Sequence, residues 1–572
     1  MKSKEQETKD IPGFKCANMN KFRFVNLTLI GILLSLGFNL SQAATVVSKA
    51  DEDLFPLAII HINDFHARFE ETNTLSNTCK PGEKCIGGYA RTVTVVKQLK
   101  EKLKDKNPIY LNAGDSFQGT LWYNFLKWNV VSHFLNLLKA DAMTIGNHEF
   151  DDGIAGVVPF LEDIQSPMIV ANIDSSDEPT FQGHYNHSLV IDKNGTKIGI
   201  IGVVLQSYDV LAKTEKLKFL DEVETVKAEA AKLNEAGVKI IIVLSHSGLE
   251  MDRKIAKEGG PFIDVIVGGH SHTFLYTGPP PGEDIPADVY PVVEEQPDGR
   301  KVYIVQASAF TKYVGELTAW FDQAGNIVRT EGNPIYLSND IIPDPEIMEE
   351  LKPYKEQVDA IGNKVHGESR VLLEKPPCVR GECSLGNFVT DSYVDHFIPL
   401  AGDGEWTYSS IAVQNAGGVR TSLSKGNLTY ADLIAVLPFE NELAVFELRG
   451  DKLLQALEYS VSKEGTTQSN MLQVSGMRNV FNLKNPPGER VESVHILCRK
   501  CKIPTYEPLN LFEDYRIAMP SFLADGGDGF SMFKEFGKNK KLGGVDIEIF
   551  TKYVERKSPI FASNEGRIKI LQ

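Results

Sequence analysis

Asp, Asn and His side chains directly follow five short apolar segments of this chain. They are Asp64 and His66 after residues 57–62, Asp115 after residues 108–111, Asn147 and His148 after residues 141–145, His246 after residues 240–244, and His270 and His272 after residues 264–267. A single histidine beside a strand is more often structural, and Gly-Asp or Gly-His pairs are common in turns. Carboxylate, amide and imidazole groups together bind divalent metal ions, and this set is too large for one ion. The repetition at five positions therefore predicts a metal site.

The segments that carry these residues are apolar at nearly every position, as strands covered on both faces are. Amphipathic stretches at residues 89–104 and 223–236 lie between them and predict helices. Buried strands that alternate with helices predict a layered α/β domain. Ligands bind at the carboxyl ends of the strands in such a sheet, which is where the polar side chains fall.

The alternation of apolar segments with amphipathic stretches changes near residue 340. Ile342-Pro343-Asp344-Pro345 opens a polar helical stretch that runs to about residue 364. A chain of 572 residues is too long for one ordinary core. We therefore expect a catalytic domain over residues 44–340, a linker helix over 341–365 and a smaller second domain over 366–572.

Composition indicates a globular protein, with 42% hydrophobic and 24% charged residues. The formal net charge is −16. Such a charge disfavours binding to nucleic acid and to anionic membranes. If the substrate is an anion, positive charge must be concentrated at the site, and metal ions would supply it.

The N-terminal region carries an apolar segment at residues 24–38, after Lys21 and Arg23 and before Ser41-Gln42-Ala43. Its length and flanks predict a signal peptide over residues 1–43, with Met19 as an alternative start. An uncleaved anchor is the other interpretation. The C-terminal residues show no apolar tail of the kind that directs lipid anchoring. We expect a secreted, extracellular protein without a stable membrane anchor.

The cysteines fit that compartment. Cys16 would leave with the leader, and six cysteines remain in three close pairs: Cys79 and Cys85, Cys378 and Cys383, Cys498 and Cys501. In a secreted chain such pairs predict short-loop disulfides. A zinc or redox motif is the alternative for the last pair. Asn186, Asn194 and Asn427 begin sequons that are compatible with glycosylation.

The polar clusters resemble a known family. Asp64-x-His66, Gly114-Asp115, Gly146-Asn147-His148-Glu149, His246 and Gly269-His270-x-His272 match the calcineurin-like metallophosphoesterase signature in order and spacing. The fuller strings at residues 146–151, 268–276, 415–420, 436–439 and 522–530 resemble the 5'-nucleotidase/apyrase branch. The resemblance runs from about residue 57 to 570. It implies an N-terminal four-layer α/β-β/α sandwich, joined by the linker helix to a smaller α/β nucleotide-binding domain.

The resemblance also implies a two-metal site. Asp64, His66 and His270 would hold one ion, Asn147 and His246 would hold the other, and Asp115 would bridge them. Imidazole and carboxylate ligands favour zinc, with manganese or another divalent ion as the alternative. His148 would act as a proton donor or charge stabiliser, oriented by Asp151. Capping of a helix is the other interpretation of Asp151 and Asp152.

The second domain would recognise the nucleotide. By resemblance, Phe439 and Phe522 would sandwich the base, Asp528 would hold the ribose, and Asn415 and Arg420 would contact phosphate. Without the resemblance, the two phenylalanines would be assigned to the core. Members of the family often carry an arginine directly after the first cysteine of the Cys378/Cys383 loop, where this chain has Val379, so Arg380 is the candidate substitute. His272 replaces an asparagine found in some AMP-hydrolysing members.

Three functions follow, in order of preference. The first is apyrase-type hydrolysis of extracellular ATP and ADP to AMP, which would oppose platelet aggregation if the source feeds on blood. The second is hydrolysis of AMP to adenosine. The third is a secreted binding protein on the same scaffold, for which degenerate metal ligands would be the sign, and the full ligand set disfavours it.

Overall fold

The computed structural model describes residues 54–571 except 81, 207–211 and 463–469. The signal-peptide expectation, with Met19 and Cys16, lies outside these residues. Strands β1 to β14 pair only with one another among the described residues, and so do strands β15 to β25. The chain thus has two halves, each with its own sheets.

The first half contains two six-stranded sheets. One has the order β13-β12-β1-β2-β3, with β14 paired to β12, and the other has the order β10-β11-β9-β8-β6-β5. Their strands are β1 (Phe55–Ile62), β2 (Ile109–Asn112), β3 (Ala142–Met143), β5 (Ser188–Lys193), β6 (Thr196–Val204), β8 (Ile240–His246), β9 (Val265–Val267), β10 (Val292–Glu295), β11 (Lys301–Val305), β12 (Tyr313–Phe321), β13 (Ile327–Gly332) and β14 (Ile335–Tyr336). A separate two-stranded sheet joins β4 (Ile173–Asp174) and β7 (Lys218–Phe219).

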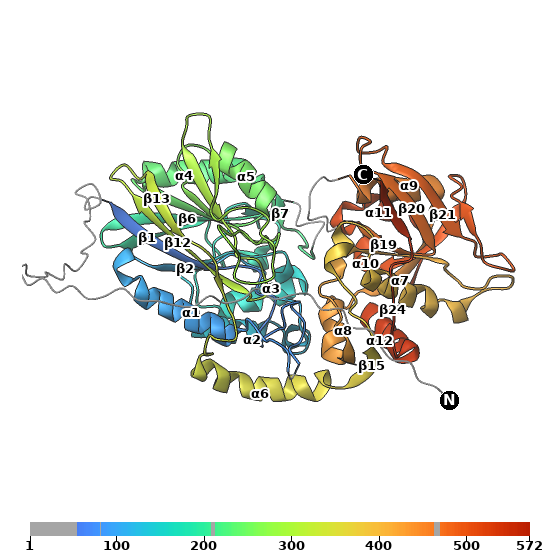
Figure 1. Cartoon of the computed structure of the whole chain (residues 1–572). Helices are drawn as coiled ribbons and strands as arrows, with labels where there is room; N and C mark the ends of the chain where they lie inside the picture. Colours follow the sequence, from blue (N-terminus) through green and yellow to red (C-terminus); the bar gives the residue numbers. More distant parts are fainter. Residues whose placement is uncertain (1–53, 81, 207–211, 463–469, 572) are drawn as a thin grey trace, which may run out of the picture. The chain divides into compact units, whose positions relative to one another are not determined.

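Alternation along β1 explains the layering. Leu57 and Ile59 pack in a core shared with β6, β8 and β9, whereas Ala58 and Ile60 pack with helices on the opposite face. The helices of this half are α1 (Tyr89–Lys102), α2 (Leu121–Leu137), α3 (Gly153–Asp163), α4 (Glu222–Glu235) and α5 (Leu249–Glu258). Figure 1 shows α1 and α2 on one side of the strands and α4 and α5 on the other. This arrangement confirms the expected four-layer sandwich.

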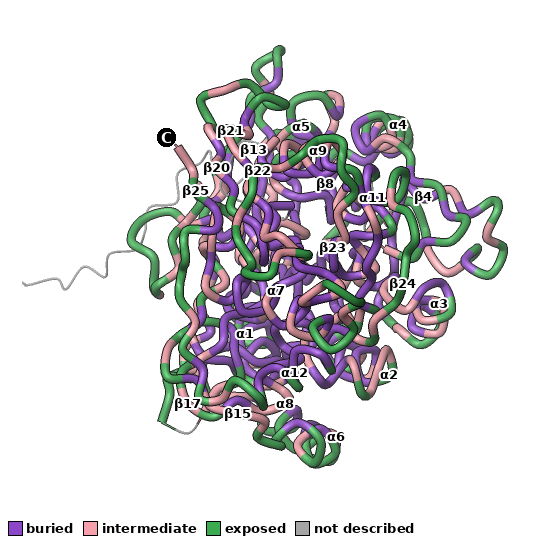
Figure 2. Tube along the Cα trace, turned by 90° about the vertical axis from the view of Figure 1, so that its right-hand side faces the viewer, coloured by how far each residue is buried: buried purple, intermediate pink, exposed green. Residues whose placement is uncertain are grey.

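Helix α6 (Pro345–Gly362) follows the first half, as the proline-rich opening predicts. Asp344 caps it by accepting hydrogen bonds from the backbone N–H groups of Glu346 and Ile347 at 3.1 and 3.2 Å. Ile347, Leu351 and Val358 are buried, and most of the other residues of the helix are at least partly exposed, as the colours along α6 in Figure 2 show.

The second half is built on a five-stranded sheet of order β19-β16-β23-β18-β24 and a four-stranded sheet of order β22-β21-β20-β25. These strands are β16 (Ile411–Asn415), β18 (Glu442–Arg449), β19 (Leu472–Ser475), β20 (Met477–Asn482), β21 (Val491–Leu497), β22 (Tyr506–Pro508), β23 (Asp514–Pro520), β24 (Lys538–Val545) and β25 (Ile568–Leu571), and a further pair joins β15 (Val365–Ser369) to β17 (Gly426–Thr429). The helices are α7 (Ser384–His396), α8 (Tyr430–Val436), α9 (Gly450–Ser460), α10 (Ser521–Ala524), α11 (Ser531–Phe536) and α12 (Asp546–Lys557).

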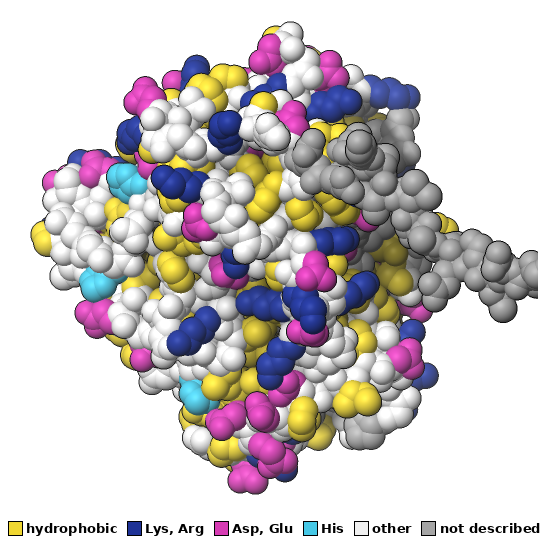
Figure 3. Space-filling view, turned by 90° about the vertical axis from the view of Figure 1, so that its left-hand side faces the viewer, with side chains coloured by type: hydrophobic (Ala, Val, Ile, Leu, Met, Phe, Trp, Pro, Cys, Tyr) yellow, Lys and Arg dark blue, Asp and Glu magenta, His cyan; other side chains and the backbone are white. Residues whose placement is uncertain are grey.

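All three expected disulfides are present: Cys79–Cys85, Cys378–Cys383 and Cys498–Cys501. Within the described ranges, no helix combines the length and the apolar character that crossing a bilayer requires. The acidic net charge does not produce one uniformly acidic surface, because Figure 3 shows lysine and arginine side chains mixed with acidic ones on one face.

Candidate metal centre

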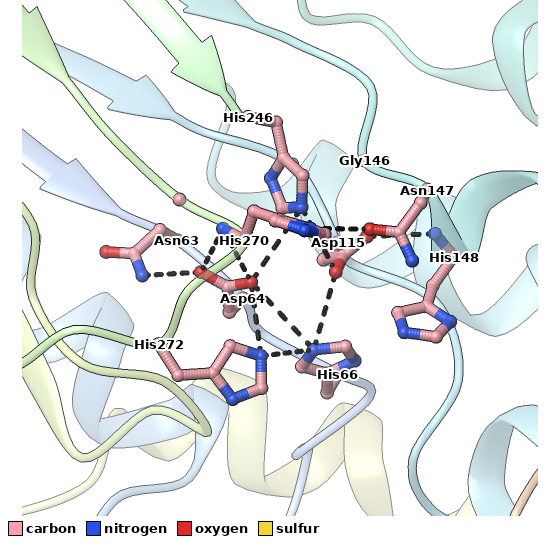
Figure 4. A network of polar contacts seen from close by, with 12 residues as sticks. Asn63, Asp64, His66, Asp115, Gly146, Asn147, His148, His246, His270 and His272 are labelled. Carbon is pink, nitrogen blue, oxygen red and sulfur yellow. Dashed lines mark hydrogen bonds and ion pairs between the residues drawn. The ribbon is translucent and has the colours of Figure 1, made fainter. Parts of the chain in front are cut away.

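Two sheets deliver the polar side chains to one place. Strands β1, β2 and β3 are parallel neighbours in the first sheet, and β8 and β9 are parallel neighbours in the second. Because the carboxyl ends of parallel strands meet at one edge, the residues that follow them converge. Figure 4 shows the side chains from both sheets pointing toward one another.

The first ligand group consists of Asp64, His66, Asp115 and His272. His66 Nε2 lies 3.1 Å from His272 Nε2 and 3.6 Å from Asp115 Oδ2. His272 Nε2 lies 3.3 Å from Asp64 Oδ1. These atoms come from three different strand ends and point at one another.

The second ligand group consists of Asp115, His246 and His270. His246 Nε2 lies 3.1 Å from Asp115 Oδ2. Asn147 adjoins the group, because its Oδ1 lies 2.8 Å from His270 Nδ1. Asp115 belongs to both ligand groups, which is the position that the sequence predicts for a bridging carboxylate.

The chemistry of the two groups fits divalent cations. Burial lowers the pKa of His66 well below its usual value and that of His270 to about 3, which keeps both imidazoles in the neutral form that binds metals. Burial also opposes protonation of His246, but the carboxylates of Asp115 and Asp64 outweigh it and raise its pKa to about 10. Positive charge is therefore favoured between these carboxylates, and the donor set suits two ions.

His270 and His272 are placed differently from the sequence expectation. The expectation grouped His270 with Asp64 and His66, whereas the structure places its ring beside Asn147 and His246. His272 occupies the place beside Asp64 and His66 that was expected for His270. The sequence did not lead to a prediction of His272 as a metal ligand. Both histidines lie in one Gly-His-Ser-His motif, and the second histidine of that motif was the available signal.

His272→Ala is expected to lower the metal content from two ions to about one per chain, because His272 belongs to the first ligand group alone. Elemental analysis of the purified, metal-loaded protein measures this. His187→Ala, which removes an exposed imidazole, is the matched control. Full occupancy of both positions in the His272 variant would contradict the grouping.

The ligand positions have an unusual backbone. Asp64, His66, Asp115, His270 and His272 have φ values of 51, 50, 54, 73 and 52°. Residues other than glycine rarely adopt this left-handed conformation, and strain of this kind concentrates at functional sites. The backbone at Gly146 also lies close to the Asp115 side chain, because a Cβ added to Gly146 would lie 2.0 Å from Asp115 Oδ1.

Glu149 holds two ligand loops together, a role that the sequence reasoning did not assign. Its buried carboxylate accepts hydrogen bonds from the backbone N–H groups of Asp115 at 3.1 Å, Ser116 at 2.6 Å and Gly146 at 2.5 Å. Burial and the Asp115 carboxylate raise the pKa of Glu149 to about 7. One side chain thereby fixes the loop after β2 relative to the loop after β3.

His148 lies beside the ligand groups without belonging to either of them. Its backbone N–H donates to Asp115 Oδ1 at 2.9 Å, and its Nδ1 lies 2.8 Å from Asp151 Oδ2. Burial alone would lower its pKa, but Asp151 and Asp115 outweigh burial and raise it. The Asp151 side chain therefore engages the imidazole, as expected, whereas Asp152 contacts Tyr123 and Lys127.

Arg420 from the second half reaches the first ligand group. Its Nη2 donates to His66 Nε2 at 3.2 Å, and its guanidinium lies 5.5 Å from the centre of the Phe439 ring. Phe439 in turn stacks on His148, with ring centres 5.3 Å apart and planes 10° apart. The expected phosphate and base residues Arg420 and Phe439 are thus brought to the metal centre.

The other residues that were expected to bind the nucleotide lie at different places in the second half. Asn415 Nδ2 donates to Asp528 Oδ2 at 2.7 Å. Phe522 lies against Gly527 and the core of the second half, and among the described residues it makes no ring contact with Phe439. Arg380 is exposed and makes no side-chain hydrogen bond or ion pair within the part of the chain described, because the neighbouring Val379 packs inward. The structure does not bring Arg380 to the site.

Comparisons with known proteins agree with this geometry. A family model described as "Calcineurin-like phosphoesterase" matches residues 57–274, and one described as "5'-nucleotidase, C-terminal domain" matches residues 365–535. An apyrase of Tabanus yao is 50% identical over 523 residues, covering 91% of this chain and 94% of that protein. The chain belongs to the 5'-nucleotidase family.

Other relatives of this family are similar along most of the chain. The 5'-nucleotidase of Homo sapiens is 37% identical over 547 residues, covering 94% of this chain and 93% of that protein. The solved structure of a 5'-nucleotidase precursor from Thermus thermophilus matches with a TM-score of 0.83 and 36% identity, covering 90% of this chain and 99% of that one. The chain is therefore a hydrolase of nucleotide phosphates, with a family fold that implies two divalent metal ions.

Proposed function

We propose that the chain is a secreted apyrase-type enzyme that hydrolyses ATP and ADP to AMP and phosphate. The observation that carries the proposal is the contact of Arg420 with His66. This contact places a cation suited to phosphate binding beside the two ligand groups that share Asp115. The order of substrates rests on the relatives: proteins named apyrase from Tabanus yao, Aedes albopictus and Aedes aegypti are 50, 41 and 40% identical.

Hydrolysis of AMP to adenosine is the second candidate. It is supported by relatives named 5'-nucleotidase, including those of snake venom and of Homo sapiens, at 37 to 40% identity. The two reactions need the same chemistry at the phosphate and differ in how many phosphates lie between the metal centre and the nucleoside.

The proposed metal ions are zinc, with manganese or another divalent ion as the alternative, since imidazole and carboxylate ligands suit both. Asp64, His66, Asp115 and His272 would hold one ion, and Asp115, Asn147, His246 and His270 the other. When bound, two such ions neutralise phosphate oxygens and activate the attacking water.

Side chains of the protein would bind the nucleotide and assist the transfer of its phosphate. Arg420 would donate N–H groups to the oxygens of the transferred phosphate. His148 would donate a proton to the leaving oxygen or stabilise its charge, and Asp151 would hold the imidazole in the orientation that this requires. Asn415 with Asp528, and Phe439 with Phe522, would bind the ribose and the base of the nucleotide. The two phenylalanine rings need only the faces of a base, so several nucleosides would be accepted.

Secretion and domain organisation complete the proposal. We place a catalytic domain at residues 44–340, the linker helix at 341–365 and a nucleotide-recognising domain at 366–572. The disulfides and the exposed sequon asparagines Asn186, Asn194 and Asn427 support an extracellular protein. The net charge of −16 supports nucleotides rather than nucleic acid as partners.

Phosphate release from ATP, ADP and AMP by the purified, metal-loaded chain tests the proposal. We expect release from ATP and ADP, accumulation of AMP, and loss of activity after chelation. Release from AMP alone would replace the first candidate with the second. Release from none of the three with either zinc or manganese would refute both.

A further inference from the structure

Two cationic residues, Lys375 and Arg420, lie on neighbouring segments of the second half, and Lys375 has no carboxylate partner among the described residues. Neither forms an ion pair with Asp or Glu among the residues whose placement is described. Lys375 is half-buried and Arg420 reaches the first ligand group. Cations that are withdrawn from water without an anion are unfavourable unless a ligand supplies the missing charge.

The backbone fixes Lys375 beside the segment that carries Arg420. Leu373 and Leu423 exchange two backbone hydrogen bonds of 2.9 Å. The N–H of Lys375 donates to Ser422 Oγ at 3.0 Å. The short helix Pro376–Val379 begins directly after Lys375, so its position does not depend on a flexible loop.

The electrostatics of Lys375 agree with this placement beside the Arg420 segment. Burial, together with repulsion from Arg420, lowers the pKa of Lys375 to about 8. Arg420 donates to His66 of the first ligand group, whereas no hydrogen bond or ion pair joins the Lys375 side chain to either ligand group among the described residues. Of the two cations, Arg420 is thus the one in contact with the ligand groups.

We propose that Lys375 binds a phosphate of the nucleotide other than the one held at the ligand groups, and thereby favours nucleotides with more than one phosphate. This rests on the proposed function. A phosphate at the ligand groups meets Arg420, which contacts His66. The next phosphate toward the nucleoside would lie beyond Arg420, and Lys375, held beside Ser422 of the segment that carries Arg420, would supply it with a second positive charge.

Arg380 provides a matched control from the same loop. It is also a cation, but it is exposed and makes no contact with the site among the described residues. A general loss of positive charge from this loop would affect both variants equally. A specific phosphate contact would affect Lys375 alone.

Calorimetric titration of the metal-loaded full chain tests the inference without turnover. The probes are α,β-methylene-ADP, which carries two phosphates, and AMP, which carries one. We expect Lys375→Met to weaken binding of the ADP analogue by about tenfold or more and binding of AMP by less than about threefold. Lys375→Arg should retain most of the affinity, and Arg380→Met should retain both affinities.

Equal weakening of both probes, or no weakening of either, would overturn the role of Lys375. KM and kcat for ADP provide a second readout, with a rise in KM and little change in kcat expected. Melting temperatures identify a folding defect, in which case Lys375→Gln and Lys375→Arg decide the question. A wild-type chain that hydrolyses no nucleotide would instead refute the proposed function, so the two failures are distinguishable.

Discussion

Asp115→Asn is expected to remove both metal ions and to abolish phosphate release. Asp115 is the residue shared by the two ligand groups, and its Oδ2 lies 3.1 Å from His246 and 3.6 Å from His66. Burial alone would raise its pKa, but His246, His148 and His66 hold the pKa well below its usual range. The neutral amide keeps the shape of the side chain and loses the negative charge that the ions require.

The expected fall in metal affinity exceeds the roughly 10–100-fold that loss of a hydrogen-bond partner of a ligand costs. Elemental analysis and phosphate release measure the two effects. Asp105→Asn is the control, since it removes an exposed carboxylate outside both groups. An Asp115 variant that retains two ions and normal turnover would exclude a bridging role.

His148→Ala is expected to reduce turnover by about 10²–10⁴-fold while both ions remain bound. The imidazole belongs to neither ligand group, and Asp151 Oδ2 engages its Nδ1 at 2.8 Å. Loss of the side chain thus removes a proton donor or charge stabiliser without removing a ligand. Single-turnover phosphate release combined with metal analysis separates the two properties.

His133→Ala, which removes an imidazole of α2 that pairs with Glu350 of α6 and belongs to neither ligand group, should leave turnover unchanged. A His148 variant devoid of metal would assign the imidazole to the ions instead. A His148 variant with full metal content and full turnover would show that His148 takes no part in the reaction.

The strand ends made most of the site predictable. A run such as residues 240–244 can only be buried, so the polar residue that follows it must lie at the edge of the sheet. This argument is sufficient to bring Asp64 and Asp115 together at the edge of the first sheet, whereas the approach of His246 also depends on how the second sheet packs against it. Strands covered on both faces predicted a layered α/β domain, whereas the four-layer arrangement with two sheets was implied by the family resemblance.

The finer geometry was not predictable from local patterns. Which of His270 and His272 joins which ligand group depends on left-handed backbone conformations that propensity disfavours. The orientation of Arg380 depends on the inward packing of its neighbour Val379. Glu149 stood in the Gly146–Glu149 motif without an assigned role, because its role arises from backbone N–H groups on a loop more than thirty positions earlier.

The left-handed backbone at the five ligand residues links ion binding to the stability of the fold. Each such conformation costs on the order of 1–3 kcal/mol, which the surrounding structure must offset. Ions that bind only the folded state add stability in proportion to the logarithm of their free concentration. The melting temperature should therefore depend on free metal concentration, and a chelator should loosen this edge of the sheets before the helices that cover them.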